Sequence, residues 1–372
     1  MFLLPIEEIG RARSLFRKMD MHLALQAILA GQVEAPIYVD DVEHPHFALT
    51  WAMSRVYLAG KPGNRAAAEA LRKVFSGILM REALKAGHDA YMLSYPDASW
   101  EPFIALALQE REPIQVGRQY YAFKEAKANW HSMLPSGMQV RAVDAALLAE
   151  KWHNPEYLTE EMVSERPSVE DFLAKSFGVC LTRDDEILGW CLSEYNTHHR
   201  CEVGIATRGD VRKRGLGTML ALAFVEMAEA RGVARVGWHC SANNVASGAT
   251  ALKAGFEHVA DYPAYLGWFD PALNTAQRGY FELVNDNFAD ALRYYEKALS
   301  MSEAPDWAYF GAGCAAAMLG QSERALAHLA KVVEHGAEDS DDFRESKFLT
   351  SLRENLAFNL LLEKLDKRDK GK

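Results

Sequence analysis

Short apolar runs separated by polar turns predict a series of β-strands between residues 177 and 262. The runs at 177–182 and 187–195 flank a polar turn and predict a hairpin. Further strands are predicted at 201–207, 234–240 and 256–262, and helices at 217–232 and 244–255. Because strands and helices are mixed in order, residues 131–270 are expected to form an α+β domain.

A weaker version of this order precedes it. Strands are predicted at 35–41, 46–58, 90–95 and 115–123, and helices at 65–87 and 100–110. The turn at 59–67 contains Gly and Pro but lacks the basic loop pattern of the middle block. Residues 1–130 are therefore interpreted as a degenerate copy of the middle domain.

The last block repeats itself. Residues 290–299 and 324–333 superpose with an offset of 34, which also carries Gly279 onto Gly313. This period is typical of stacked helical hairpins, and residues 271–372 resemble tetratricopeptide repeats closed by a helix at 348–365. An ordinary α-helical bundle is the alternative.

Composition limits the classes of protein that remain. A chain of 372 residues with 49% hydrophobic residues suits two or three folded domains. The net charge of −10 argues against a general nucleic-acid binder. Five cysteines without paired spacing indicate reduced thiols and no metal site. Neither a signal peptide nor a membrane span is recognisable, so we expect a cytoplasmic protein with no membrane partner.

A basic, glycine-containing loop lies between the strand at 201–207 and the following helix. Its residues Arg212, Lys213 and Arg214 supply positive charge, and Gly215 and Gly217 allow the backbone to approach a ligand closely. The start of a helix offers free N–H groups and a partial positive charge. The loop is therefore predicted to bind a phosphate group.

The loop lacks the Gly-Lys-Ser/Thr ending of a P-loop and the Gly-x-Gly-x-x-Gly of a dinucleotide site. Its Arg-x-x-Gly-x-Gly pattern resembles the acetyl-CoA pyrophosphate loop of the GNAT N-acetyltransferases. Asn244 and the pair Gly255-Phe256 resemble the second signature of that family. The resemblance implies a GNAT acyltransferase fold in two tandem halves, and the layout is similar to the zwittermicin-resistance-like subgroup.

The resemblance also assigns roles in binding acetyl-CoA, the implied acyl donor. The strand backbone would pair with the pantetheine arm, the loop amides would hold the pyrophosphate, and Asn244 would touch the arm or cap the short helix. The cofactor-binding residues implied are Ile205, Ala206, Thr207, Arg212, Lys213, Arg214, Gly215, Leu216, Gly217, Thr218 and Asn244.

Acetyl transfer to an alkylamine needs a base, because the free amine has a pKa near ~10.4. Many family members carry a carboxylate on the strand before the loop, and Glu202 stands there. A salt-bridged or edge-exposed glutamate is an equal alternative. Glu194, His198 and His199 are weaker candidates for the base.

The family's usual general acid is missing. A tyrosine often follows the motif asparagine by seven residues, but here that position is Ala251. Tyr262, Tyr265 or a water molecule could protonate the departing thiolate instead, although each tyrosine can equally be a packing residue.

These features favour an N-acetyltransferase that transfers an acetyl group from acetyl-CoA to a primary amine by direct attack in a ternary complex. The acceptor could be a small-molecule or a peptide amine, and another acyl-CoA could serve as donor. The helical repeats could bind a protein partner or mediate self-association. The alternative is a non-catalytic CoA-binding adaptor, which Ala251 favours and the intact loop disfavours.

Overall fold

The computed structural model describes residues 1–197, 199–301, 304–336 and 340–369. It divides into two compact units, which we describe separately. The first unit comprises Met1–His88, Met92–Ala107 and Gln115–Leu266. The second comprises Asp89–Tyr91, Leu108–Ile114 and Gly267–Lys372, and is therefore built from three stretches of chain. The expected three-domain division stays a prediction.

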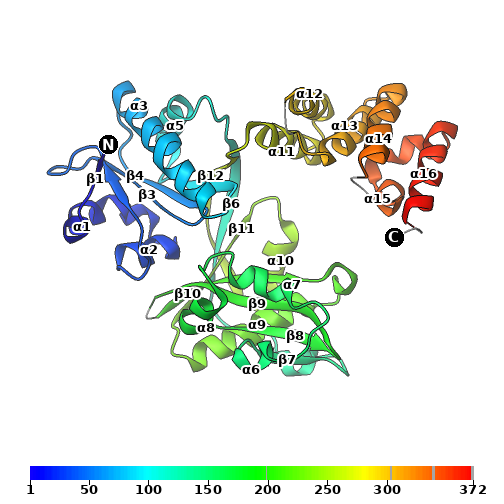
Figure 1. The fold of residues 1–372 in the computed structure, drawn as a ribbon. Coiled ribbons are helices and arrows are strands. Elements are labelled where there is room, and N and C mark those ends of the chain that lie inside the picture. Colours follow the sequence, from blue (N-terminus) through cyan, green and yellow to red (C-terminus); the bar gives the residue numbers. More distant parts are fainter. Residues whose placement is uncertain (198, 302–303, 337–339, 370–372) are drawn as a thin grey trace. The chain divides into compact units, whose positions relative to one another are not determined.

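The first unit is organised around a mixed sheet (Figure 1). Its strands are β1 (Phe2–Leu3), β2 (Ile37–Val39), β3 (Phe47–Ala52), β4 (Arg55–Gly60), β5 (Ala90–Ser94), β6 (Ile114–Phe123), β7 (Gln139–Ala142), β8 (Gly178–Arg183), β9 (Glu186–Thr197), β10 (Arg200–Thr207), β11 (Arg235–Ser241) and β12 (Phe256–Trp268). Within the described residues the strand order is β1-β2-β3-β4-β5-β12-β6-β11-β10-β9-β8-β7.

This order shows that the two predicted halves exchange their last strands. The final strand of the block at 1–130, β6, pairs antiparallel with β11 of the middle block. The final strand of the middle block, β12, lies between β5 and β6. One continuous sheet therefore joins the two halves, a feature that periodicity along the sequence does not reveal.

Helices cover the sheet of the first unit. They are α1 (Ile9–Arg13), α2 (Leu23–Leu29), α3 (Arg65–Val74), α4 (Met80–Lys85), α5 (Glu101–Ala107), α6 (Ala145–Leu148), α7 (Glu156–Met162), α8 (Val169–Lys175), α9 (Leu216–Ala230) and α10 (Val245–Ala254). The predicted helix at 65–87 is continuous through a π-helical turn at Phe75–Leu79. The sequence predicted nothing before residue 35, where α1 and α2 lie.

The central helix of the middle half is α9, which packs against β8, β9 and β10. Leu216, Leu220, Phe224 and Ala228 recur at helical spacing and are all buried. Their burial fixes the first turn of α9, and hence the loop before it, at the end of β10.

The second unit is mostly helical. Its helices are α11 (Pro271–Val284), α12 (Phe288–Leu299), α13 (Trp307–Met318), α14 (Ser322–His335), α15 (Ser340–Glu345) and α16 (Leu356–Asp369). The expectation of one helix over 348–365 is wrong, because a 3₁₀ turn at Lys347–Leu352 precedes α16. Asn355 explains the break, since its side chain accepts a hydrogen bond from the N–H of Ala357 and caps α16.

The 34-residue offset corresponds to a repeated contact. A Cβ atom on Gly279 would lie 3.0 Å from the Tyr295 ring, and one on Gly313 would lie 2.8 Å from the side chain of Leu329. Adding 34 to Gly279 and Tyr295 gives Gly313 and Leu329, so the same close helix approach occurs twice. The likeness to tetratricopeptide repeats stays a prediction.

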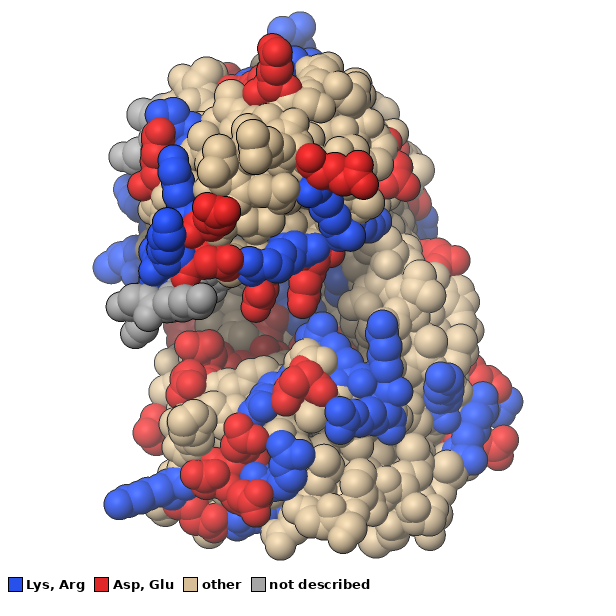
Figure 2. Space-filling model, turned by 90° about the vertical axis from the view of Figure 1, so that its right-hand side faces the viewer, with Lys and Arg blue, Asp and Glu red and all other residues tan. Residues whose placement is uncertain are grey.

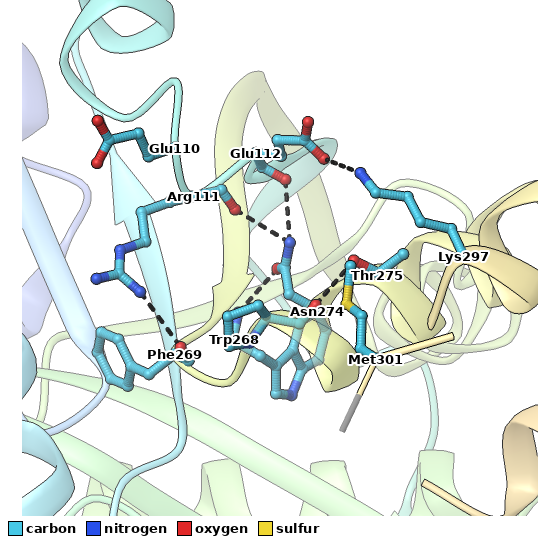
Figure 3. A pocket seen from close by; sticks show the side chains of 10 residues that line it. Glu110, Arg111, Glu112, Trp268, Phe269, Asn274, Thr275, Lys297 and Met301 are labelled. Carbon is cyan, nitrogen blue, oxygen red and sulfur yellow. Dashed lines mark hydrogen bonds and ion pairs between the residues drawn. The ribbon is translucent and has the colours of Figure 1, made fainter. Parts of the chain in front are cut away.

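A small cavity of about 160 Å³ lies where the loop at 108–114 meets α11 (Figure 3). The buried Asn274 side chain accepts a hydrogen bond from the N–H of Trp268 and donates to the carbonyls of Arg111 and Glu112. Lys297 adds an ion pair with the Glu112 carboxylate at 3.2 Å. Because both the oxygen and the nitrogen of the Asn274 amide form hydrogen bonds, we assign Asn274 a structural role in holding this loop.

Candidate active site

The strands β10 and β11 separate in the middle of the sheet. They pair in parallel from Arg200 to Val203 of β10, with Val203 opposite Trp238 of β11. Beyond Val203, β10 stays paired with β9 as far as Thr207, while β11 continues with β6 as far as Ser241. The opening exposes one backbone edge of β10 at residues 204–207, to which an extended ligand can add as a strand.

The basic loop and the start of α9 lie at the open end of this gap. Gly215 precedes α9 with a φ of +80°, a left-handed conformation that favours glycine. Lys213 also has a positive φ of 62°. The first N–H groups of α9 have no partner within the helix, so they can receive an anionic group.

A cleft of about 640 Å³ connects the strand edge with this loop. Every predicted cofactor residue except Arg214 lines it. The residues that the sequence did not single out are Val211, Trp238, Ala246, Ser247, Ala249, Thr250 and Lys253. Ala246, Ala249, Thr250 and Lys253 recur at helical spacing and therefore share one face of α10. Helical spacing after Asn244 could have identified them from the sequence.

Three of the predicted cofactor side chains also have structural partners. One is Arg214, whose Nη2 donates to the carbonyl of Asp210 at 3.5 Å. Arg212 Nε donates to the carbonyl of Thr207 at 3.0 Å, which ties the loop back to β10. Asn244 Oδ1 accepts a hydrogen bond from the N–H of Ser247 at 3.1 Å and so caps α10. The capping role of Asn244 is therefore present in the structure. Because Asn244 also lines the cleft, it is in a position to contact a ligand as well.

Glu202 lies at an irregularity of β10, where the pairing with β9 shifts between Cys201 and Val203. Only 3% of the residue is exposed. Its Oε1 accepts a hydrogen bond from the backbone N–H of Leu23, the first residue of α2, at 2.5 Å. The same oxygen lies 3.4 Å from Nε2 of His239. Glu202 is therefore a buried, paired carboxylate, and the N-terminal half helps to bury it.

His239 connects Glu202 with Tyr262. Its Nε2 lies 3.2 Å from the carbonyl of Met21 as well as near Glu202, and both neighbours only accept hydrogen bonds. Nε2 therefore carries a hydrogen. Nδ1 lies 2.8 Å from the hydroxyl of Tyr262, which donates to it when the imidazole is neutral. Glu202, His239 and Tyr262 thus form a continuous hydrogen-bonded chain across β10, β11 and β12.

Burial and neighbouring charges shift the pKa values of Glu202 and of His22, which stacks on His239. Burial alone raises the pKa of Glu202, but the charge and hydrogen bond of His239, together with Arg55 and the Leu23 N–H, outweigh it and lower that pKa to about 2. Burial and the His239 charge lower the pKa of the stacked His22 to about 3. Glu202 therefore stays ionised and can balance a positive charge on His239.

The other sequence candidates lie elsewhere or have other partners. Tyr265 stacks on Tyr95 with ring centroids 5.5 Å apart and is three residues from Tyr262, on the opposite face of β12 by strand alternation. His198 lies outside the described residues. His199 is exposed in the turn before β10. Ala251 is fully buried in α10.

A second group of carboxylates lies over Gly204 on β10. A Cβ atom there would lie 2.8 Å from Oε1 of Glu194 and 3.2 Å from Oε1 of Glu161. Arg55 is paired with Glu194 at 2.5 Å and with Glu165 at 2.6 Å. Burial, followed by the charges of Glu194 and Glu165, raises the pKa of Glu161 to about 7. Arg55 thus pairs with two of the three carboxylates, and Glu161 has no ion pair with it among the described residues.

We expect Glu161→Gln to stabilise the protein at pH 8 but not at pH 5. The raised pKa means that the folded state binds more protons than the unfolded state between about pH 4.5 and 7, so stability falls as pH rises through that window. Glutamine cannot ionise, so the variant avoids this loss in the free energy of unfolding, which is roughly 2–3 kcal/mol. Urea unfolding at both pH values measures it, with the exposed neighbour Glu160→Gln as control. Equal gains at pH 5 and pH 8 would contradict the assignment.

Acidic and basic side chains are interspersed on the face shown in Figure 2. Among the described residues, Arg208 forms ion pairs with Glu186 and Asp210. No helix among the described residues is long and apolar enough to cross a membrane. All five cysteines are buried, and among the described residues none of them forms a disulfide.

A family model described as GNAT acetyltransferase matches residues 13–265. The uncharacterized N-acetyltransferase YdfB of Bacillus subtilis (strain 168) is 24% identical over 240 residues, which are 64% of this chain and 88% of YdfB.

Two solved structures extend the comparison. A GCN5-related N-acetyltransferase-like protein from Streptococcus suis 89/1591 aligns with a TM-score of 0.52 at 22% identity, over 70% of this chain and 98% of its own. A GCN5-related N-acetyltransferase from Sphaerobacter thermophilus aligns with a TM-score of 0.50 at 16% identity, over 72% and 95% of the two chains. At these identities the likeness shows a shared fold.

Proposed function

This chain belongs to the GNAT acetyltransferase family and is an acyltransferase, and on that premise we propose that it transfers an acetyl group from acetyl-CoA to a primary amine in a ternary complex. The observation that carries the proposal is the cleft that joins the separated edge of β10 to the basic loop before α9. An extended donor with amide groups at one end and phosphates at the other matches both ends of this cleft.

The residues of the cleft provide complementary groups for such a donor. The free edge at Ile205, Ala206 and Thr207 offers backbone hydrogen bonds to the pantetheine amides. The N–H groups of the first turn of α9 and the cations of Arg212 and Lys213 meet the pyrophosphate. Acetyl-CoA supplies an activated thioester. No metal is part of the proposal.

The hydrogen-bonded chain supplies the proton steps. A carboxylate with a pKa near 2 is a weak base by itself, so we assign Glu202 the role of charge partner to His239. As the amine attacks, its proton passes to the Tyr262 oxygen while the Tyr262 proton moves to Nδ1 of His239. Tyr262 then returns a proton to the departing thiolate and is restored by His239. The proton lost by the amine is thus the one gained by the thiol.

The acceptor is a small-molecule or peptide amine that arrives on the face of β10 bearing Gly204. The protein is expected to act in the cytoplasm. Self-association or binding of a protein partner by the second unit completes the proposal. The alternative function is a CoA-binding adaptor without catalysis. Two observations favour that alternative, namely the buried Ala251 at the family's tyrosine position and the 3% exposure of Glu202.

Thiol release from acetyl-CoA in the presence of a panel of amines separates the two functions. The panel should contain aminoglycosides, polyamines and peptides with free N-termini. We expect thiol release above the hydrolysis background with at least one class, and an acetylated product one acetyl group heavier by mass spectrometry. Tight acetyl-CoA binding with no product from any amine would instead support the adaptor.

A further inference from the structure

A cleft of about 680 Å³ lies within the second unit, remote in sequence from the site described above. Its walls come from α11, α13 and α15, the first helices of successive helical pairs, with Tyr295 of α12 and the turn after α15. This volume is in the range that holds a ligand or a short peptide segment. Stacked helical pairs commonly present such a concave surface.

Aromatic rings form most of the lining. They belong to Tyr280, Tyr295, Trp307, Phe310 and Phe348. Tyr280 is 48% exposed, so part of this aromatic lining is open to solvent.

Glycine residues keep the floor of this cleft open. The Tyr295 ring lies against Gly279 of α11 and Gly311 of α13. A Cβ atom on Gly311 would lie 2.2 Å from that ring. Trp307 meets Tyr295 edge-on at 6.2 Å between ring centroids. The position of the Tyr295 ring therefore depends on glycines of both neighbouring helices.

The charged groups of the cleft are all acidic. Asp342 and Glu345 of α15 line it, together with the polar Gln277 and Ser346, and no Lys or Arg belongs to the lining among the described residues. Within that part of the chain Glu345 has no salt-bridge partner. Aromatic faces attract cations through their quadrupole, and adjacent carboxylates add to this attraction.

A cation of this chain already lies on one of these rings. Nζ of Lys347 is 4.7 Å from the centroid of the Phe348 ring, within the range of a cation–π contact. The rim of the cleft can therefore hold a positive charge next to apolar surface. This property favours a cationic partner over an anionic or a purely apolar one.

We propose that this cleft binds a basic peptide segment of a partner protein, with an Arg or Lys side chain over the aromatic rings and beside Asp342 and Glu345. The aliphatic part of such a side chain packs on the rings while its charge reaches the carboxylates. The proposal does not depend on acetyl transfer, because the groups involved all belong to the second unit.

The test uses two capped pentapeptides that contain no amine for acetylation. Ac-Leu-Arg-Leu-Arg-Leu-NH₂ and its citrulline analogue have nearly the same shape and differ in charge. In calorimetry with the full chain, we expect the arginine peptide to bind at least roughly fivefold more tightly than the citrulline peptide. The preference should shrink as ionic strength rises, because the carboxylates lie at the rim.

Variants locate the binding in the cleft. Asp342→Asn combined with Glu345→Gln should remove most of the preference for arginine, and Trp307→Ala should weaken both peptides. Glu323→Gln combined with Glu363→Gln, at exposed positions of α14 and α16, is the charge-matched control and should leave binding unchanged. Circular dichroism checks that each variant is folded.

Three results would overturn the proposal. Equal affinity for the two peptides would make the cleft an apolar surface without a preference for cations. An arginine preference that survives the double variant would place the binding elsewhere. Self-association that is blocked by Trp307→Ala, with no peptide binding, would make a second copy of this chain the occupant.

Discussion

Acetyl-CoA is expected to lose at least about 100-fold in affinity for a Gly215→Glu variant. Two effects combine at this position. The φ of +80° places any side chain in the left-handed region, at a cost of roughly 1–2 kcal/mol. The new carboxylate would also stand at the start of α9, where the N–H groups and Lys213 are proposed to meet the pyrophosphate. Calorimetry with acetyl-CoA measures the loss.

Gly215→Ala and Gly215→Asn separate the two effects. Alanine adds the backbone strain without the charge, and asparagine tolerates the left-handed conformation. Among the described residues, a Cβ atom at this position would have Met133 alone within 4 Å, at 3.9 Å, so steric overlap does not affect the comparison. We expect the affinity order glycine, asparagine, alanine, glutamate. Unchanged affinity in the glutamate variant would mean that the loop does not bind the donor.

The elements around the cleft were predictable because each carries a local signal. The strand β10, the glycine loop, α9, α10 and the start of β12 follow directly from apolar periodicity and from the glycines at their ends. The exchange of strands β6 and β12 between the two halves was not predictable, because pairing between distant strands depends on tertiary packing and not on local pattern. Nor did the sequence indicate α2, a short helix with almost no polar face.

The candidate site was predictable only in part, for the same physical reason. The cofactor residues are contiguous in sequence, so a motif could identify them. Glu202 was recognised, but its contacts with Leu23 and His239 join residues 179 and 37 positions away and depend on the fold of both halves. His239 stands in an apolar strand, where a single histidine reads as a packing residue. The zwittermicin-resistance-like subgroup stays a prediction.

Turnover is expected to fall by about 100-fold in Glu202→Gln, while the affinity for acetyl-CoA stays nearly unchanged. The amide still accepts the hydrogen bond from the Leu23 N–H, so the position of α2 is kept. It cannot balance a positive charge on His239, which lies 3.4 Å away. The defect should shrink at high pH, where more of the acceptor amine arrives neutral. Steady-state kinetics across pH measure both effects.

A double-mutant comparison tests whether Glu202 acts through His239 and Tyr262. If the three groups work as one chain, His239→Gln and Tyr262→Phe should each cost about as much as Glu202→Gln, and a double variant should cost little more than a single one. Glu150→Gln is the control carboxylate, since Glu150 is exposed and paired with Arg141. Multiplicative losses would mean that Glu202 and Tyr262 act independently.

Wild-type turnover in Glu202→Gln at every pH would remove Glu202 from the mechanism. Glu194 or a water chain would then be the next candidate.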